Sequence, residues 1–278
     1  MRIGVAVFAT DVSWPIDDLA AAIETRGLAS LTLPEHTHMP VDHSPHPAGP
    51  DLSEEYARTL DPFVALAVAA GATTTLELIT GVALLAQRDP IVTAKEVATL
   101  DHVSGGRVTL GVGYGWNVPE LEHHGVTFAE RRDVVRDRIA LMRALWTREI
   151  AEIDTEHARL APSRAWPKPV QQPHPPVLLG AGLGPRALAD LVAVCDGWLP
   201  QGMRATAEGL PRLQEAWQAA GRGDDPIVHV SGARPDADYL RRLADLGVER
   251  ASVWLPSSSR DEVLPTLDEL ATVAEEVG

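Results

Sequence analysis

Hydrophobic and polar positions alternate between a strand-like and a helix-like period along the whole chain. Apolar runs typical of buried strands are expected at residues 2–8, 29–33, 76–80, 107–110, 177–179, 197–199, 227–230 and 251–255. Segments with helical spacing follow them at residues 15–26, 62–71, 90–103, 129–146, 185–194, 206–220, 236–246 and 260–277. Strands and helices that alternate in this way predict an α/β fold, a (β/α)8 TIM barrel, with residues 1–278 as a single domain.

A doubly wound parallel sheet is the competing architecture. Such a sheet usually has a glycine-rich turn after its first strand, whereas this chain has Ala9-Thr10-Asp11 there, and the sheet needs no eighth strand. We therefore expect the barrel, interrupted by irregular, proline-rich segments at residues 36–60 and 147–175. Loops of that length in a compact domain are usually functional or mobile.

Composition narrows the classes of partner and compartment. The 278 residues carry a formal net charge of −15, which disfavours nucleic acids and anionic membranes as partners. Cys195 is the single cysteine, so an internal disulfide is excluded. No apolar run is long enough to span a membrane, and the first strand is expected to begin at residue 2. We therefore expect a cytoplasmic protein without a signal peptide.

The carboxyl ends of the predicted strands, where barrel enzymes build their active sites, are rich in glycine and poor in charge. Gly111, Gly113 and Gly115 follow the fourth strand, where missing Cβ atoms let the backbone approach a flat or phosphorylated ligand. Residues 180–184 form a second glycine loop before Pro185, and helix N–H groups there form a natural phosphate cradle. A plain turn is the alternative for each loop. Together they favour a planar cofactor that performs the electronic step itself.

Glu35 and His36 form an acid–histidine pair just after the second strand. His36 could donate a proton near neutral pH, and Glu35 could bond a ring nitrogen or orient a partner. The alternative is that both residues only cap loops at the mouth of the barrel and contact no ligand. Arg88, after the third strand, could meet an acidic ligand tail or pair with Asp89.

A metal site is the less favoured interpretation of the histidines. His36, His38, His43 and His46 lie close together in sequence, but the fifth and sixth strands end in glycine and proline and supply no further ligand. We therefore expect no bound metal. His229, on a late strand, is expected to be a structural residue, and Cys195, which has no adjacent base, a buried small side chain.

Several motifs together resemble the bacterial-luciferase-like oxidoreductases and, within them, the subgroup that uses the deazaflavin coenzyme F420. These motifs lie at residues 35–40, 80–82, 87–90, 100–113, 116–117, 166–169, 175–180 and 196–198. The resemblance covers nearly the whole chain. It implies a TIM barrel that transfers a hydride between F420 and a small organic substrate.

The resemblance also implies roles for individual residues. A cis peptide that supports the cofactor ring falls at Gly81-Val82. Glu35 falls at the position of a ring-contacting acid and His36 at that of a proton donor, so these two are the candidate catalytic residues. The remaining candidate cofactor contacts are Thr80, Val112, Gly113, Asn117, Gly180, Ala181, Gly182 and Leu183.

Tyr114 is the main departure from this pattern. Sugar-phosphate dehydrogenases of the family carry a catalytic glutamate at its position, so that substrate class is disfavoured here. Two alternatives to the F420-dependent enzyme are an FMN-dependent luciferase-like monooxygenase and a flavin- or deazaflavin-binding protein without turnover. The resemblance further implies a homodimer, and it leaves the substrate unnamed.

Overall fold

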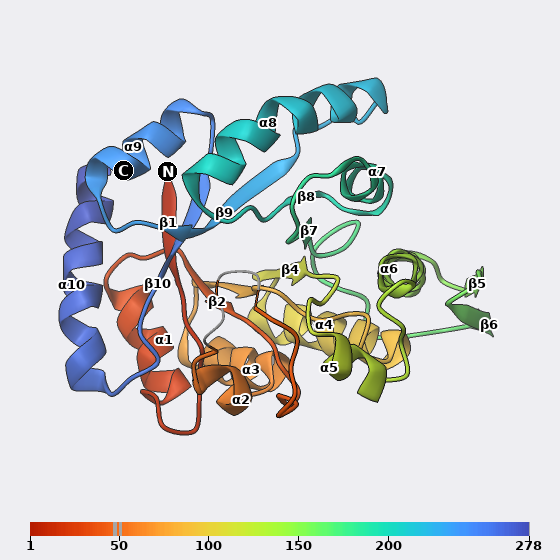
Figure 1. The fold of residues 1–278 in the computed structure, drawn as a ribbon, viewed down its shortest axis with the longest axis horizontal. Coiled ribbons are helices and arrows are strands. Elements are labelled where there is room, and N and C mark those ends of the chain that lie inside the picture. Colours follow the sequence, from red (N-terminus) through yellow and green to blue (C-terminus); the bar gives the residue numbers. More distant parts are fainter. Residues whose placement is uncertain (47–48, 50–51, 278) are drawn as a thin grey trace.

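Eight parallel strands close into a barrel in the computed structural model, which describes residues 1–46, 49 and 52–277. Their order around the barrel is β1-β10-β9-β8-β7-β4-β3-β2 (Figure 1). The bounds are Arg2–Ala6 for β1, Ser30–Leu33 for β2, Glu77–Thr80 for β3, Val108–Val112 for β4, Val177–Leu179 for β7, Gly197–Trp198 for β8, Ile227–Ala233 for β9 and Arg250–Trp254 for β10. The predicted TIM barrel and its strands are confirmed.

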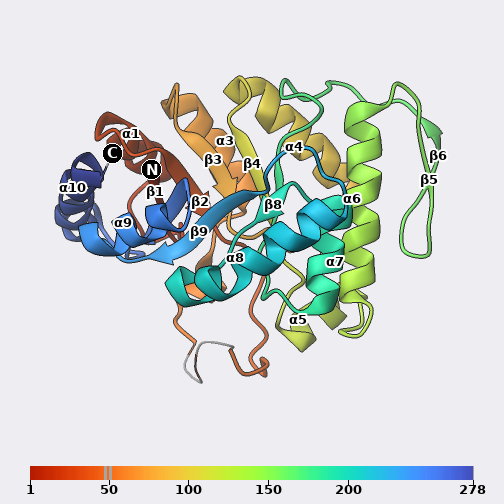
Figure 2. The same ribbon diagram turned by 90° about the horizontal axis from the view of Figure 1, so that it is seen from above.

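Helices cover the outside of the barrel (Figure 2). The main ones are α1 (Ile16–Thr25), α3 (Pro62–Ala72), α4 (Pro90–Ser104), α6 (Arg131–Thr147), α7 (Pro185–Val194), α8 (Gly202–Ala219), α9 (Ala237–Asp245) and α10 (Arg260–Val277). Among the described residues, none of these or the shorter helices combines the length and apolar character that a membrane span requires.

The two irregular segments contain elements that the hydrophobic pattern did not predict. The short helix α2 (Glu55–Arg58) lies in the first segment, of which residues 47, 48, 50 and 51 lie outside the described part. The second contains an antiparallel hairpin of β5 (Ala151–Asp154) and β6 (Arg159–Ser163), which projects beyond α6 (Figure 2). A further helix, α5 (Val118–His123), follows β4. The hairpin is largely exposed, so no apolar strand signal marks it.

Pairing between the first and last strands closes the barrel, with Arg2 opposite Arg250 and Ala6 opposite Trp254. The interior is polar at several levels. His229 is buried there, and its Nε2 lies 2.7 Å from Ser252 Oγ. Burial, followed by the charges of Arg250 and Arg2, lowers the pKa of His229 to about 3. The expected structural role of His229 is confirmed.

Neighbouring strands bring the glycine loops to one rim. Gly111 at the end of β4 must be glycine, because a Cβ atom there would lie 2.0 Å from the carbonyl oxygen of Thr80 on β3. On the other side of β4, Val112 pairs with Leu179 of β7, and the Gly180 N–H donates to the Val112 carbonyl at 2.8 Å. The loops after β3, β4 and β7 therefore meet side by side.

Candidate functional site

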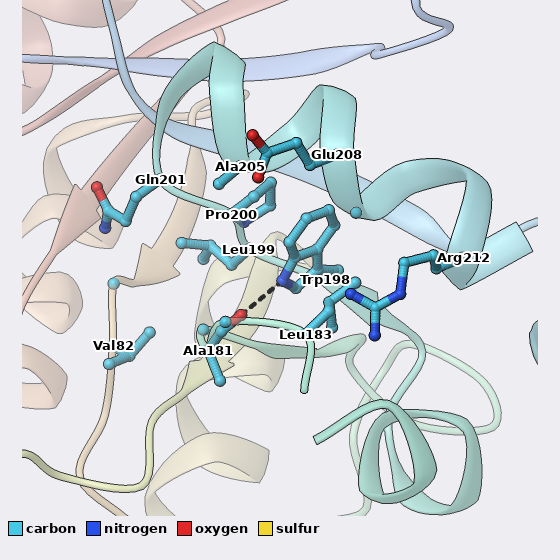
Figure 3. Close-up of a pocket in the computed structure, with 14 residues that line it drawn as sticks. Val82, Ala181, Leu183, Trp198, Leu199, Pro200, Gln201, Ala205, Glu208 and Arg212 are labelled. Carbon is cyan, nitrogen blue, oxygen red and sulfur yellow. Dashed lines mark hydrogen bonds between the residues drawn. The ribbon is translucent and has the colours of Figure 1, made fainter. Parts of the chain in front are cut away.

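A cavity of about 330 Å³ opens where β3, β7 and β8 end and α8 begins. That volume lies within the range of small-molecule sites. Most of its walls are backbone and apolar side chains (Figure 3). It is lined by Gly81, Val82, Gly180, Ala181, Gly182, Leu183, Trp198, Leu199, Pro200, Gln201, Ala205, Glu208, Gly209 and Arg212. Six residues predicted to contact a cofactor, those at 81–82 and 180–183, therefore gather in one cavity.

The wall after β3 is a cis peptide bond between Gly81 and Val82, at the position that the sequence resemblance implied. The Val82 side chain fits into a gap left by two glycines. A Cβ atom on Gly113 would lie 2.5 Å from one Val82 methyl, and a Cβ atom on Gly180 would lie 2.5 Å from the other. Val82 is thus fixed against two backbones, and its orientation in the cavity depends on both glycines.

The opposite end of the cavity is suited to an anion. Helix α7 begins at Pro185, which has no N–H, and it has no side-chain cap and no acidic residue in its first turn, so the Arg186 and Ala187 N–H groups are left available. Arg212 reaches from α8 toward the loop that carries Leu183 (Figure 3), and it has no hydrogen bond or ion pair within the described part of the chain. The Trp198 indole N–H donates to the Ala181 carbonyl at 2.8 Å and so fixes the loop.

Glu35 lies beneath this rim with both carboxylate oxygens occupied. One accepts the Leu84 N–H at 2.7 Å, and the other accepts Arg88 Nε at 2.6 Å. Leu84 lies two residues beyond Val82, so Glu35 holds the segment that carries the cis peptide. The structure therefore places Glu35 as a support of that segment and outside the residues that line the cavity.

Arg88 corrects the interpretation offered from sequence. Its guanidinium binds Glu35, Asp61 and Glu96, and the Asp89 carboxylate instead caps α4 by accepting the Ile91 and Val92 N–H groups. The three carboxylates come from separate segments of the chain that the fold brings together around the Arg88 guanidinium. No free charge remains on Arg88 for a ligand tail.

His36 lies three residues after the end of β2, whose last residue, Leu33, accepts the Gly81 N–H at its carbonyl at 2.7 Å. Its Nδ1 lies 3.1 and 3.0 Å from the two carboxylate oxygens of Glu120. The rings of Tyr56 and Trp116 flank the imidazole at centroid distances of 5.3 and 5.9 Å. His36 is therefore a titratable group in a largely aromatic environment at the mouth of the barrel.

The other candidate cofactor contacts take structural positions around the cavity. Thr80 and Val112 are buried under it, and Thr80 Oγ1 donates to the Gly111 carbonyl. Asn117 is turned toward the segment after β2, where its Oδ1 accepts the Ser44 N–H at 3.0 Å and its Nδ2 contacts Met39. The structure therefore does not bring the Asn117 side chain into the cavity.

Tyr114 binds α7. Its hydroxyl donates to Asp190 at 2.7 Å, and Arg132 lies 4.7 Å from its ring centroid. Burial and the hydrogen bond to Asp190 raise the pKa of Tyr114, so it stays protonated. Tyr114 fastens the loop after β4 to the outer helices.

Sequence reasoning missed Glu120 and Arg212. Glu120 is on the short helix α5, whose only local signal is Pro119 in its first turn, a position that favours helix starts. Arg212 is an exposed residue of α8, and nothing in the sequence around it indicates that it borders the cavity. Only the folded chain brings either residue to the rim.

The remaining histidines and the cysteine have other environments. His38 Nε2 lies 2.8 Å from His123 Nδ1, and Thr37 Oγ1 lies 2.9 Å from His124 Nε2, all at the surface. Across residues 1–46, 49 and 52–277, no three His, Cys, Asp or Glu side chains are arranged to hold a metal ion. Cys195 is buried, as expected, and burial raises its pKa.

Comparison with known proteins gives the family. Residues 15–277 match the model of the family described as luciferase-like monooxygenase. An uncharacterized protein of Mycobacterium tuberculosis is 41% identical over 277 residues, which cover 98% of each chain. A putative coenzyme F420-dependent oxidoreductase of the same organism is 32% identical over 151 residues, 50% of this chain and 43% of that one. Among solved structures, the monooxygenase RslO1 from Streptomyces bottropensis superposes with a TM-score of 0.82 at 20% identity, covering 99% of both chains. The chain therefore belongs to the luciferase-like monooxygenase family.

Proposed function

We propose that this protein is an F420-dependent oxidoreductase that transfers a hydride between the deazaflavin and a small organic substrate. The cavity carries this proposal, because an apolar wall at Val82 and a cationic side chain, Arg212, beside the glycine loop of Gly182 and Leu183 occur in one space. A flat ring with a phosphate-bearing tail needs that combination. The partial match to a putative F420-dependent oxidoreductase supports the same choice of cofactor.

The residues present fit such a group. Gly182 and Gly184 have open space where a Cβ atom would be, so a ligand can approach their backbone closely. Val82 would support one face of the ring, and the loop of residues 180–184, the start of α7 and Arg212 would hold the phosphate. When bound, the deazaflavin would supply the hydride chemistry.

The chain itself contributes orientation and a proton. Val82, fixed by Gly113 and Gly180, limits where the ring can lie, and small displacements slow a transfer step strongly. Two carboxylates near the cavity are already paired, since Glu35 is bound to Arg88 and Leu84 and the cavity-lining Glu208 pairs with Arg204 at 3.2 Å. His36 is then the group that gives or takes the proton that accompanies hydride transfer.

A parallel titration with F420 and FMN, followed by fluorescence quenching, tests the cofactor. We expect saturable quenching with F420 and much weaker quenching with FMN. Preferential binding of FMN would replace the proposal with an FMN-dependent monooxygenase, and monooxygenase is the activity that the family description names. Binding of neither at high micromolar concentration would refute both.

Turnover separates an enzyme from a protein that only binds the cofactor. A panel of small alcohols, aldehydes, ketones and unsaturated compounds, scored by change in the visible absorbance of the cofactor, addresses this directly. We expect at least one compound to be reduced or oxidised.

A second copy of this chain is the proposed protein partner. Val64 and Val68 on α3 and Ile91 and Val92 on α4 form an exposed apolar face, with Val64 67% exposed and Val92 55% exposed. An exposed apolar patch is the kind of surface that a protein partner covers, and a two-fold axis across it would cover the same residues of both copies. The mass in solution should be that of a dimer, and Val68→Glu should shift it toward the monomer.

A further inference from the structure

A buried carboxylate beside His36 has no role in the function proposed so far. The side chain of Glu120 is 1% exposed and that of His36 is 6% exposed. Both carboxylate oxygens of Glu120 lie within hydrogen-bond distance of His36 Nδ1, at 3.1 and 3.0 Å. A buried carboxylate is costly unless it is paired, so this contact is a built feature of the site.

Several contacts fix Glu120 in this position. Helix α5 is held to the segment after β2 by the Val118 N–H, which donates to Ser44 Oγ, and by the Ser44 N–H, which donates to Asn117 Oδ1. On the outer side, His38 and His123 meet at 2.8 Å. These contacts join the two segments and hold the Glu120 carboxylate beside the His36 imidazole.

This geometry determines which nitrogen of His36 carries the proton. An ionised carboxylate can only accept hydrogen bonds, so the Nδ1 that faces Glu120 must be the N–H donor. In the neutral imidazole, Nε2 then carries the lone pair. Nε2 has no hydrogen-bond partner among the residues that the structure describes, and the flanking Tyr56 and Trp116 rings contribute no charge.

We propose that Glu120 is the positioning residue of His36: it holds the imidazole in the Nδ1–H tautomer so that Nε2 exchanges the proton with the substrate. This rests on the function proposed above. A proton that leaves the substrate forms an Nε2–H bond while Nδ1–H remains, and the resulting positive charge lies about 3.0 Å from the carboxylate. In the reverse direction the same Nε2–H bond breaks and the substrate gains the proton.

Nitrogen NMR of the cofactor-free protein tests the tautomer without any substrate, with the His36 signals assigned from a His36→Gln variant. We expect Nδ1–H in the wild-type protein. Glu120→Leu removes the acceptor and should move the proton to Nε2, whereas Glu120→Gln, whose amide oxygen still accepts, should keep it on Nδ1. Glu122→Leu is the matched control, because Glu122 is on the same helix but exposed, and it should leave the His36 signals unchanged.

Kinetics supply the second readout once a substrate is known. Glu120→Leu should lower kcat by about 10- to 100-fold, the range found when the hydrogen-bond partner of a metal-binding histidine is lost, with KM changed by less than about 2-fold. Glu120→Gln should recover part of the rate. A wild-type His36 protonated on Nε2, or a Glu120→Leu variant with the wild-type tautomer, would overturn the inference. Failure of F420 to bind would instead reject the proposed function and leave the tautomer result standing.

Discussion

Two parts of the barrel rim differ in the kind of residues that form them. The cofactor side, after β3, β4 and β7, is made of backbone and small apolar side chains, with Val82 lodged between Gly113 and Gly180. The proton side, after β2 and on α5, is made of titratable groups, with His36 paired to Glu120. In the proposed function, the shape of the first part holds the ring and one nitrogen atom of His36 handles the proton. The comparison teaches that the two proposed roles rest on different residues, so each can be tested without the other.

Substitution of His36 tests most sharply whether the two parts of the rim act separately. His36→Gln should lower the rate of hydride transfer about 10²- to 10⁴-fold, the usual contribution of general acid–base catalysis. The F420 dissociation constant should change by less than about 2-fold, because His36 does not line the cavity. Single-turnover absorbance and fluorescence titration measure the two quantities. His102→Gln, on the exposed face of α4, is the control. A variant that loses binding while the loaded enzyme keeps its rate would contradict the division.

Arg88 and Glu35 join the two regions, and breaking their pair should cost stability. Arg88→Met leaves the buried Glu35 carboxylate without its cation, and such losses lower the free energy of unfolding by about 3 kcal/mol. Urea denaturation measures it. The control Arg241→Met removes an exposed pair with Asp238 and should cost less than about 1 kcal/mol. Equal losses of unfolding free energy in the two variants would show that the ion pairs of Arg88 do not stabilise the rim.

The glycine beneath Val82 tests the cofactor side. Gly180→Ala places a methyl group 2.5 Å from a Val82 methyl, and overpacking of this kind costs about 1–3 kcal/mol. We expect F420 affinity to fall by about 10-fold, which is 1.4 kcal/mol, because the wall must move. Gly71→Ala on α3, where a Cβ atom meets nothing within 4 Å and which does not line the cavity, should bind F420 as the wild type does. The reverse ranking in a fluorescence titration would show that Val82 does not define the wall.

A residue far from both regions supplies the smallest effect. Partial burial tends to raise the pKa of Glu24, but hydrogen bonds from the Thr75, Thr74 and Leu76 N–H groups and the Thr75 hydroxyl outweigh it, and the pKa falls from 4.5 to about 2. A depressed folded-state pKa contributes stability that is present above about pH 4.5 and lost as pH falls toward 2.

Glu24→Gln should therefore lower the free energy of unfolding by about 1 kcal/mol at neutral pH, a value reduced by solvent screening. The difference from the wild type should shrink between pH 4.5 and pH 2, as urea midpoints across that interval would show. F420 affinity should not change. A difference that grows toward low pH would contradict the role of the ionised carboxylate.

Sequence predicted the cofactor side better than the proton side for a physical reason. Glycines after strands, Pro185 at a helix start and the strand periodicity are local signals, and they identified the barrel and the loops that meet in the cavity. The partner of His36 lies 84 residues away on a six-residue helix, and no local pattern encodes that contact. Arg88 likewise meets Asp61 and Glu96 instead of its neighbour Asp89.

A crystal structure of the protein soaked with F420 tests the central claim most directly. We expect the ring against Val82, the tail phosphate at the N–H groups of Gly182, Leu183 and Arg186, and His36 Nε2 facing the side of the ring open to substrate. A ring bound elsewhere on the barrel, or one with Nδ1 of His36 turned toward the substrate side and Glu120 left unpaired, would contradict it.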